Sequence, residues 1–216
     1  MSAATVGIAV AAIPDGNTIW VCRTNTTGAV TISDAVNCTM DPVRKSICAP
    51  NFFCHSVPAV IDTLSRVSTA TLTTVLLNRG LRNVWLRGTR PIRPGQPRLV
   101  GEAFTFRFVP AREDLATPAS WGSPISTRAA IEDMQPGQIA VIDAMGVTDA
   151  GVFGDILCAR MVKRGVAGLV TDGVVRDAAG VLSTGLPVWC QGVAAPPSVA
   201  GLTFVAWQQP VACGGV

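Results

Sequence analysis

The sequence is poor in the side chains that carry most acid–base and metal chemistry in enzymes. It has no tyrosine, and His55 is its single histidine. This excludes a multi-histidine metal site and argues against Ser-His-Asp and Cys-His catalysis. Carboxylates, arginines, water and backbone amides are the chemistry that is left. A metal bound by such a chain would be a hard cation with oxygen ligands.

Charge is also scarce, and the cysteines form no familiar pattern. Charged residues make up 14% of the 216 residues, and the formal net charge is +3, with the densest basic stretch at 79–98. So small and dispersed a charge argues against a nucleic-acid surface. The seven cysteines are odd in number and lack a CxxC pair, so they fit neither a disulfide framework nor a zinc site. We therefore expect a cytoplasmic protein.

Long hydrophobic runs are missing too. The longest apolar run at the start of the chain, residues 5–13, is too short to span a bilayer, so we expect no membrane partner. The hydrophobic content of 49% is nevertheless enough for the full core of one α/β domain. Residues 1–57 hold four of the seven cysteines and show no sustained apolar period. They are expected to be a poorly ordered N-terminal extension, with the domain at 58–216.

After this extension, the apolar pattern predicts regular elements. Helical spacing around residues 59–67 predicts one helix, and Ser68 is placed to begin a second helix that ends at Gly80. Strands are expected at 83–87 and at 99–108. The loop at 110–124 is long enough to be either a lid or an interface, and the sequence favours neither.

The stretch 154–177 reads as a turn, a helix, a strand and a second turn. An acidic residue near Gly154 favours a helix start, and Gly165 is placed to end that helix after about nine residues. The apolar run 166–171 then reads as a buried strand that stops at Asp172-Gly173. A similar strand at 138–143 precedes the helix, so the whole reads as a crossover unit with two parallel strands.

A crossover unit brings the loop before its helix and the loop after its second strand to the same edge of the sheet. Gly154 should therefore lie beside Arg176 and Asp177. The amides of residues 154–157 could then hold a carboxylate, Arg176 could bind the same group or an adjacent carbonyl, and Asp177 could hold a divalent cation. A 2-oxo acid fits such a site. The alternative interpretation is a solvated ion pair that opens the next helix.

Three motifs carry a resemblance to a known family, and they are Gly154-Asp155-Ile156-Leu157, Asp172-Gly173-Val174-Val175-Arg176-Asp177 and Gly185-Leu186-Pro187-Val188. Together they resemble the RraA-like family, which includes class II 4-hydroxy-4-methyl-2-oxoglutarate aldolases and regulators of ribonuclease E activity. The likeness runs from about Asp62 to Val216. It implies a layered β/β/α swivelling-domain-like sandwich and a homotrimer or hexamer. Family members continue beyond the position of Val216, so the domain looks truncated at its C-terminus.

The resemblance implies a divalent-metal-dependent aldolase or decarboxylase that releases pyruvate from a small 2-oxo acid substrate. Asp177 would hold Mg²⁺ or Mn²⁺, and Arg176 would stabilise the developing negative charge. Gly154, Asp155, Ile156 and Leu157 would bind the substrate carboxylate, and Asp155 would orient a proton-carrying water. Cys190 and Gln191 depart from the family pattern, in which a basic residue is often found near Gln191, so the resemblance does not carry over a substrate contact at this position. The alternative from the same family is a non-catalytic regulator that binds a ribonuclease.

Overall fold

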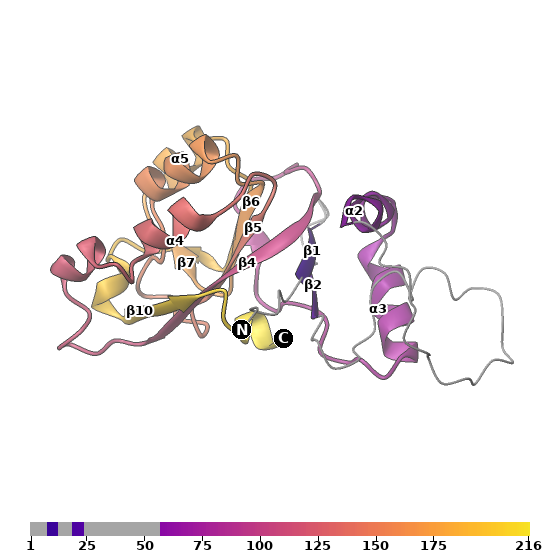
Figure 1. Ribbon diagram of the computed structural model, residues 1–216, viewed down its shortest axis with the longest axis horizontal. Helices are drawn as coiled ribbons and strands as arrows, with labels where there is room; N and C mark the ends of the chain where they lie inside the picture. Colours follow the sequence, from indigo (N-terminus) through magenta and orange to yellow (C-terminus); the bar gives the residue numbers. More distant parts are fainter. Residues whose placement is uncertain (1–7, 13–18, 24–56) are drawn as a thin grey trace, which may run out of the picture.

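The computed structural model describes residues 8–12, 19–23 and 57–216, which form a single α/β domain built on a mixed sheet flanked by helices (Figure 1). The fold class expected from the sequence is confirmed. The order along the sheet is β2-β1-β4-β5-β6-β8-β3, and β10 also pairs with β4. The strands of this sheet are β1 Ile8–Ala12, β2 Ile19–Arg23, β3 Arg90–Pro91, β4 Leu99–Pro110, β5 Ile139–Asp143, β6 Gly168–Thr171, β8 Val188–Cys190 and β10 Leu202–Trp207.

Four central strands, β4, β5, β6 and β8, run parallel to one another. β4 is long enough to pair with β5 on one edge and with two antiparallel strands on the other. On that second edge, β1 pairs with residues 99–102 and β10 with residues 106–110. All four parallel strands therefore end at one carboxyl edge, which is where ligands usually bind in α/β proteins.

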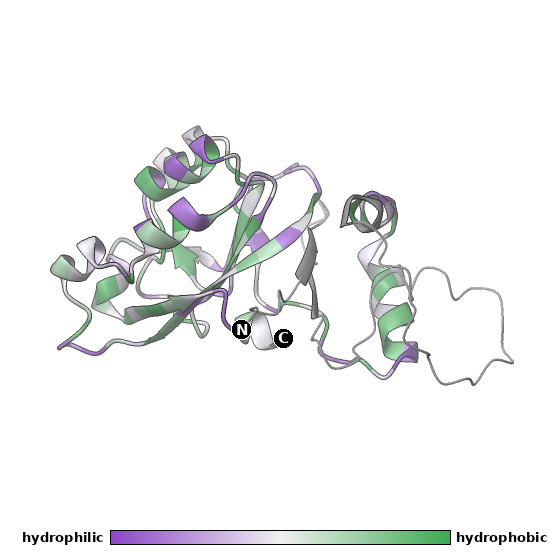
Figure 2. Ribbon diagram, viewed as in Figure 1, coloured by the Kyte–Doolittle hydropathy of each residue, from purple (hydrophilic) through white to green (hydrophobic). Residues whose placement is uncertain are grey.

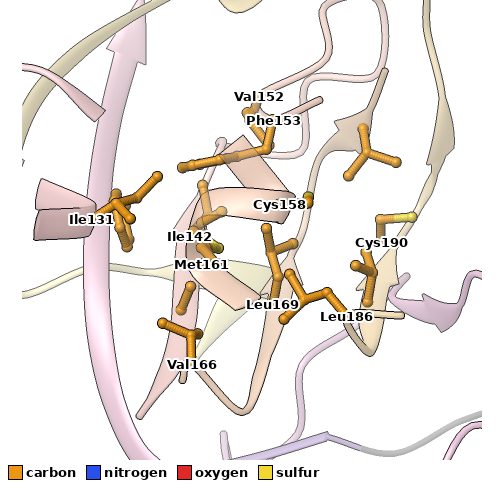
Figure 3. Packing of buried hydrophobic residues seen from close by; sticks show 14 of the residues in the cluster. Ile131, Ile142, Val152, Phe153, Cys158, Met161, Val166, Leu169, Leu186 and Cys190 are labelled. Carbon is orange, nitrogen blue, oxygen red and sulfur yellow. The ribbon is translucent and has the colours of Figure 1, made fainter. Parts of the chain in front are cut away.

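β5, the helix α5 (Asp155–Lys163) and β6 form the crossover unit that the sequence predicts. α5 forms because Cys158 and Met161 share one face and bury it against the sheet, where Figure 3 shows both within the core. The helix ends before Gly165, whose φ of +73° is a conformation that glycine adopts at little cost.

The two faces of the parallel strands bury separate hydrophobic clusters. The larger lies under α5 and α4 (Thr127–Asp133) and contains Phe106, Phe153, Ile142 and Leu169 (Figure 3). The smaller lies on the opposite face, where the segment around Leu86 and the 3-10 helix η3 (Cys213–Gly215) cover the strands. Figure 2 shows these central strands mainly in hydrophobic colours, whereas the helices that cover them also carry hydrophilic residues. Because both faces are covered, side chains at the carboxyl edge are held between two packed layers.

Helices α2 (Val57–Arg66) and α3 (Thr69–Asn78) lie beside β1 and β2 on the side of the sheet away from α5, and Figure 1 shows α2 end-on and α3 along its length. Ser68 caps α3 as predicted, since its side chain accepts a hydrogen bond from the amide of Thr71. The end of α2 is tied to the sheet by Arg98, whose guanidinium donates to the carbonyl oxygens of Ser65 and Val67. These bonds satisfy carbonyls that the end of α2 leaves without helical partners.

Two segments in the first half of the chain differ from what the sequence predicts. The strand predicted at 83–87 is wrong, because this segment forms no strand between α3 and β3. Segments 8–12 and 19–23 of the expected N-terminal extension are strands of the main sheet. Residues 1–7, 13–18 and 24–56 lie outside the described residues, so the order of the extension as a whole stays a prediction. No helix in the described ranges is long and apolar enough to cross a membrane.

Candidate active site

The candidate site begins at Gly154, the N-cap of α5. Gly154 has an extended backbone and no side chain to cap the helix. The first-turn amides of a helix have no partner inside the helix, so this end is open to an acceptor from a ligand. The chain reaches Gly154 through Phe153, which is held in place because its carbonyl oxygen accepts the amide of Arg176 at 2.9 Å.

Arg176 and Asp177 follow the short strand β7 (Val174–Val175), which pairs with β9 (Gly192–Val193) outside the main sheet. Asp177 adopts a left-handed conformation, with φ 52° and ψ 47°, and is the N-cap of the helix α6 (Ala178–Ser183). Its side chain makes no capping bond. One carboxylate oxygen, Oδ2, instead accepts a hydrogen bond from Arg176 Nε at 3.0 Å, with the two side chains 35% and 46% exposed.

The structure brings these two parts of the site together, as the sequence predicts. A Cβ atom added to Gly154 would lie 2.8 Å from Asp177 Oδ2 and 3.1 Å from Arg176 Cγ. Any side chain at position 154 would therefore push the ion pair away. The predicted alternative, a solvated pair that opens the next helix, describes the place of Asp177 at the start of α6 but leaves this contact with Gly154 unexplained.

The amides of residues 154–157 are less free than the sequence suggests. The amide of Ile156 donates to Asp155 Oδ1 at 2.7 Å, so a ligand would have to displace that carboxylate oxygen. Asp155 also packs on Gly180 of α6, where an added Cβ would meet Asp155 Cβ at 2.7 Å. The carboxylate of Asp155 is thus fixed between α5 and α6, while the Ile156 side chain is 77% exposed beside it.

The donor set is sparse for a metal ion. Within the described ranges, no group of three or more His, Cys, Asp or Glu side chains could hold one. Mg²⁺ and Mn²⁺, however, prefer oxygen ligands, and Mg²⁺ commonly keeps several waters and binds one or two carboxylates plus the substrate. A half-exposed Asp177 with one oxygen left by Arg176 fits this mode. Asp177 is therefore the residue that would hold the cation.

The carboxyl edge carries a second cluster of polar residues, which the sequence did not identify as part of a site. Asp143 ends β5, Asp172 and Gln191 directly follow β6 and β8, and the three line a pocket of about 530 Å³ together with Arg87. The sequence did hold a signal for this cluster, because each of the three residues ends or directly follows a predicted strand. Burial raises the pKa of the Asp172 carboxyl above its ordinary value, and the nearby charge of Asp143 raises it further, whereas amide donors from Gly214 and Ala144 lower it.

With this geometry in view, comparison with known proteins places the chain in a family. The RraA-like family, described as Aldolase/RraA, matches residues 57–216, and the chain belongs to it. A candidate 4-hydroxy-4-methyl-2-oxoglutarate aldolase of Halalkalibacterium halodurans is 30% identical over 96 residues, 44% of this chain and 45% of that protein. Protein DlpA of Legionella pneumophila is 27% identical over 139 residues, 64% of this chain and 21% of that protein. The matches thus span less than half of either curated relative.

Solved structures agree with this assignment. RraAS2 of Streptomyces coelicolor, described as an unusual member of the RNase ES inhibitor RraA protein family, is 37% identical with a TM-score of 0.63. The match covers 72% of this chain and 74% of that one. An uncharacterized protein of Pseudomonas syringae is 26% identical with a TM-score of 0.60, over 74% of this chain and 70% of that one. The family therefore contains both aldolases and ribonuclease inhibitors.

Proposed function

We propose that this chain is a divalent-metal-dependent carbon–carbon lyase that cleaves 2-oxo acids and releases pyruvate. The substrates would be of the oxaloacetate or 4-hydroxy-4-methyl-2-oxoglutarate type. One observation carries the proposal: the open end of α5 at Gly154 lies against the Arg176–Asp177 pair. Amides, a guanidinium and a carboxylate thus meet at one point of the carboxyl edge, and a planar oxo-carboxylate needs these partners.

The residues of the chain divide the work of such a reaction. The first-turn amides of α5 that Asp155 leaves unbonded hold the substrate carboxylate, and Arg176 donates hydrogen bonds from its Nη atoms to the oxo group. As the bond between C3 and C4 breaks, its electron pair forms the enolate of pyruvate. From oxaloacetate, the C4 carboxylate leaves as carbon dioxide. From the 4-hydroxy acid, the C4 hydroxyl gives its proton to a water oriented by Asp155, and the fragment leaves as a second molecule of pyruvate. Arg176 stabilises the negative charge that develops on the enolate oxygen. A cation held by Asp177 would supply further positive charge as a Lewis acid.

The enolate must then receive a proton at C3. Asp155 lies between α5 and α6 with its Oδ1 bonded to the amide of Ile156, and we propose that its other oxygen, Oδ2, orients a water for this step. A Schiff-base route would instead need a lysine at the site. Lys163 is at the far end of α5, eight residues from Asp155, which is about 12 Å along the helix axis. The placement of Lys163 therefore favours the metal route.

A homotrimer or hexamer, implied by the resemblance, is part of the same proposal. Ile156 in the first turn of α5 and Val193 at the end of β9 are large apolar residues with exposures of 77% and 54%. Such exposed apolar residues are candidates for a contact between subunits. Light scattering after size-exclusion chromatography measures the number of copies, and a monomer at micromolar concentration contradicts this part of the proposal.

The second candidate function is a non-catalytic regulator that binds and inhibits a ribonuclease of the RNase E type. The likeness to RraAS2, at 37% identity, is the observation that favours it. A regulator of this kind would work through its surface and would not depend on the Arg176–Asp177 pair. The two candidates therefore predict different effects of changes at Asp177.

The experiment that separates them is an assay of pyruvate release from several 2-oxo acids, with Mg²⁺ or Mn²⁺ and with EDTA. A lactate dehydrogenase coupled assay follows pyruvate, and a protein-free sample corrects for spontaneous decarboxylation of oxaloacetate. We expect turnover that EDTA abolishes. Tight binding to a ribonuclease without turnover of any 2-oxo acid would favour the regulator and contradict the lyase.

A further inference from the structure

Asp172 is a buried carboxylate, 4% exposed, that links three segments of the carboxyl edge. Its Oδ1 accepts the amide of Ala144 at 2.8 Å, and its Oδ2 accepts the amide of Gly214 at 3.0 Å. The backbone carbonyl oxygen of Asp172 accepts Gln191 Nε2 at 2.5 Å. The same residue therefore ties the end of β6 to the end of β5, to η3 and to the end of β8.

Two of these ends lead to the two halves of the candidate active site. The chain leaves β5 at Ala144 and runs to Gly154, whereas it leaves β6 at Asp172 and runs through β7 to Arg176. The bond between Asp172 Oδ1 and the amide of Ala144 joins these exits directly. The two exits also approach each other closely at Gly173, since a Cβ added there would lie 2.6 Å from Ala144 Cβ.

We infer that Asp172 is a positioning residue that sets the distance between Gly154 and the Arg176–Asp177 pair. This inference rests on the proposed function for its catalytic consequence, although the positional role itself does not depend on the reaction. The side-chain hydrogen bonds of Asp172 go to the amides of Ala144 and Gly214 and to none of Gly154, Arg176 and Asp177, so both its oxygens are already used by backbone amides. It acts through the two chain segments that it joins, neither as a metal ligand nor as a proton donor.

Asp143 offers a matched control. It is 7% exposed, lines the same pocket and also accepts two amides, those of Met145 and Ala212. One of these bonds is local to the turn after β5, and the other reaches the segment before η3. Removing Asp143 therefore costs the same number of hydrogen bonds as removing Asp172 but leaves the link between the β5 and β6 exits intact.

The first test is hydrogen–deuterium exchange of the full chain, read by mass spectrometry of peptides. In Asp172→Ala, we expect amides in 144–153 and in 173–177 to exchange at least about tenfold faster than in the wild type, because local opening becomes easier. In Asp143→Ala, exchange in 173–177 should stay at the wild-type rate. Wild-type exchange in Asp172→Ala, or equal acceleration of 173–177 in both variants, overturns the inference.

Asp172→Asn guards against a variant that fails to fold. Its single amide oxygen can still accept one of the two amides, so its exchange rates should fall between those of the wild type and Asp172→Ala. Suppose that Asp172→Ala is unfolded and that residues 173–177 of Asp172→Asn exchange at the wild-type rate. Asp172 would then serve stability alone, and the inference would be overturned.

The second test compares turnover with metal binding. A misplacement of about 1 Å between the two halves can lower a rate by about 100-fold, so kcat for pyruvate release should fall by that order in Asp172→Ala. The Kd for Mn²⁺, which depends on Asp177 alone, should change less than about twofold. An unchanged kcat in this variant overturns the inference. If the wild type shows no turnover at all, the lyase proposal fails, while the exchange experiment still decides the role of Asp172.

Discussion

Three carboxylates near the carboxyl edge show how surroundings give one residue type different uses. Asp143 and Asp172 are buried, and each of their oxygens accepts a backbone amide. Asp177 is 46% exposed at its side chain and commits one oxygen to Arg176. Only the last has lone pairs that face solvent. The sequence places Asp143 at the end of a predicted strand, Asp172 just after one and Asp177 in a turn, but it does not give their burial, because burial depends on η3 and on chain segments far away in sequence.

Replacing Arg176 by lysine should lower kcat/KM even though the charge is kept. A lysine ammonium cannot reproduce the two parallel hydrogen bonds that a guanidinium offers to a planar oxo acid. We expect a loss on the order of 2–4 kcal/mol of transition-state stabilisation, by analogy with removing one oxyanion donor. Steady-state kinetics measure it, with Arg66→Lys in the exposed Asp62–Arg66 pair of α2 as control. An Arg176→Lys protein with wild-type kcat/KM would show that Arg176 has no such role.

Asp172 should also make stability depend on pH. Its pKa is raised in the folded protein, chiefly by burial, so the folded state binds this proton more tightly than the unfolded state does. The resulting stabilisation is fully present below the ordinary pKa and is lost as pH rises through the raised value. The Tm of the wild type relative to Asp172→Asn should therefore fall as pH rises above the ordinary carboxyl pKa, as thermal melts over a pH series would show. A constant difference across this series contradicts the assignment.

At the scale of elements, the sequence predicted those features that depend on interactions between residues close together in the chain. Helix α5 and the cap at Ser68 were predictable because their hydrogen bonds connect residues only three or four positions apart in the sequence. The conformation of segment 83–87 was not predictable in this way, because its alternation of buried and exposed residues is also the pattern of a strand. Val84 and Leu86 are buried, but Arg87 donates its amide to Gly214, a partner that only the folded chain supplies.

Gly154→Ala should disrupt the candidate site without unfolding the domain. The new Cβ would meet Asp177 Oδ2 at 2.8 Å and Arg176 Cγ at 3.1 Å, so the ion pair must move. We expect activity to fall by about 100-fold, since small displacements of positioned groups have effects of that size. Gly122→Ala is the matched control, because an added Cβ there has no heavy atom within 4 Å. Equal activities for the two variants would mean that the close approach at Gly154 is irrelevant to function.

At the scale of the whole molecule, the sheet extends beyond the boundary that the sequence indicated. β1 covers the edge of β4 at residues 99–102, and β2 pairs with β1 in turn. The sequence did not reveal this pairing, because partners about 90 residues apart leave no local pattern. Membership of the RraA-like family, by contrast, was recognisable from motifs, since the glycine and Arg-Asp positions lie within one crossover unit.

Removing residues 1–56 should make the domain less stable and less soluble. The deletion uncovers backbone N–H and C=O groups of β4 that now pair with β1, and open sheet edges promote aggregation. Thermal melts and light scattering of the full chain and of a chain beginning at Val57 measure the effect. A shortened chain that stays monodisperse with an unchanged Tm would show that β1 contributes nothing to the edge of β4.

The central claim, that the Gly154 and Arg176–Asp177 cluster is a metal-dependent lyase site, is tested most directly at Asp177. The measurement is EDTA-sensitive pyruvate release from oxaloacetate by Asp177→Ala, beside Asp62→Ala, which removes an exposed, ion-paired carboxylate on α2 away from α5. Because Asp177 is the carboxylate assigned to the cation, its loss should abolish metal-dependent turnover in a domain that thermal melts show to be folded. Asp62→Ala should keep wild-type activity. Pyruvate release that persists in Asp177→Ala and is still suppressed by EDTA would contradict the account.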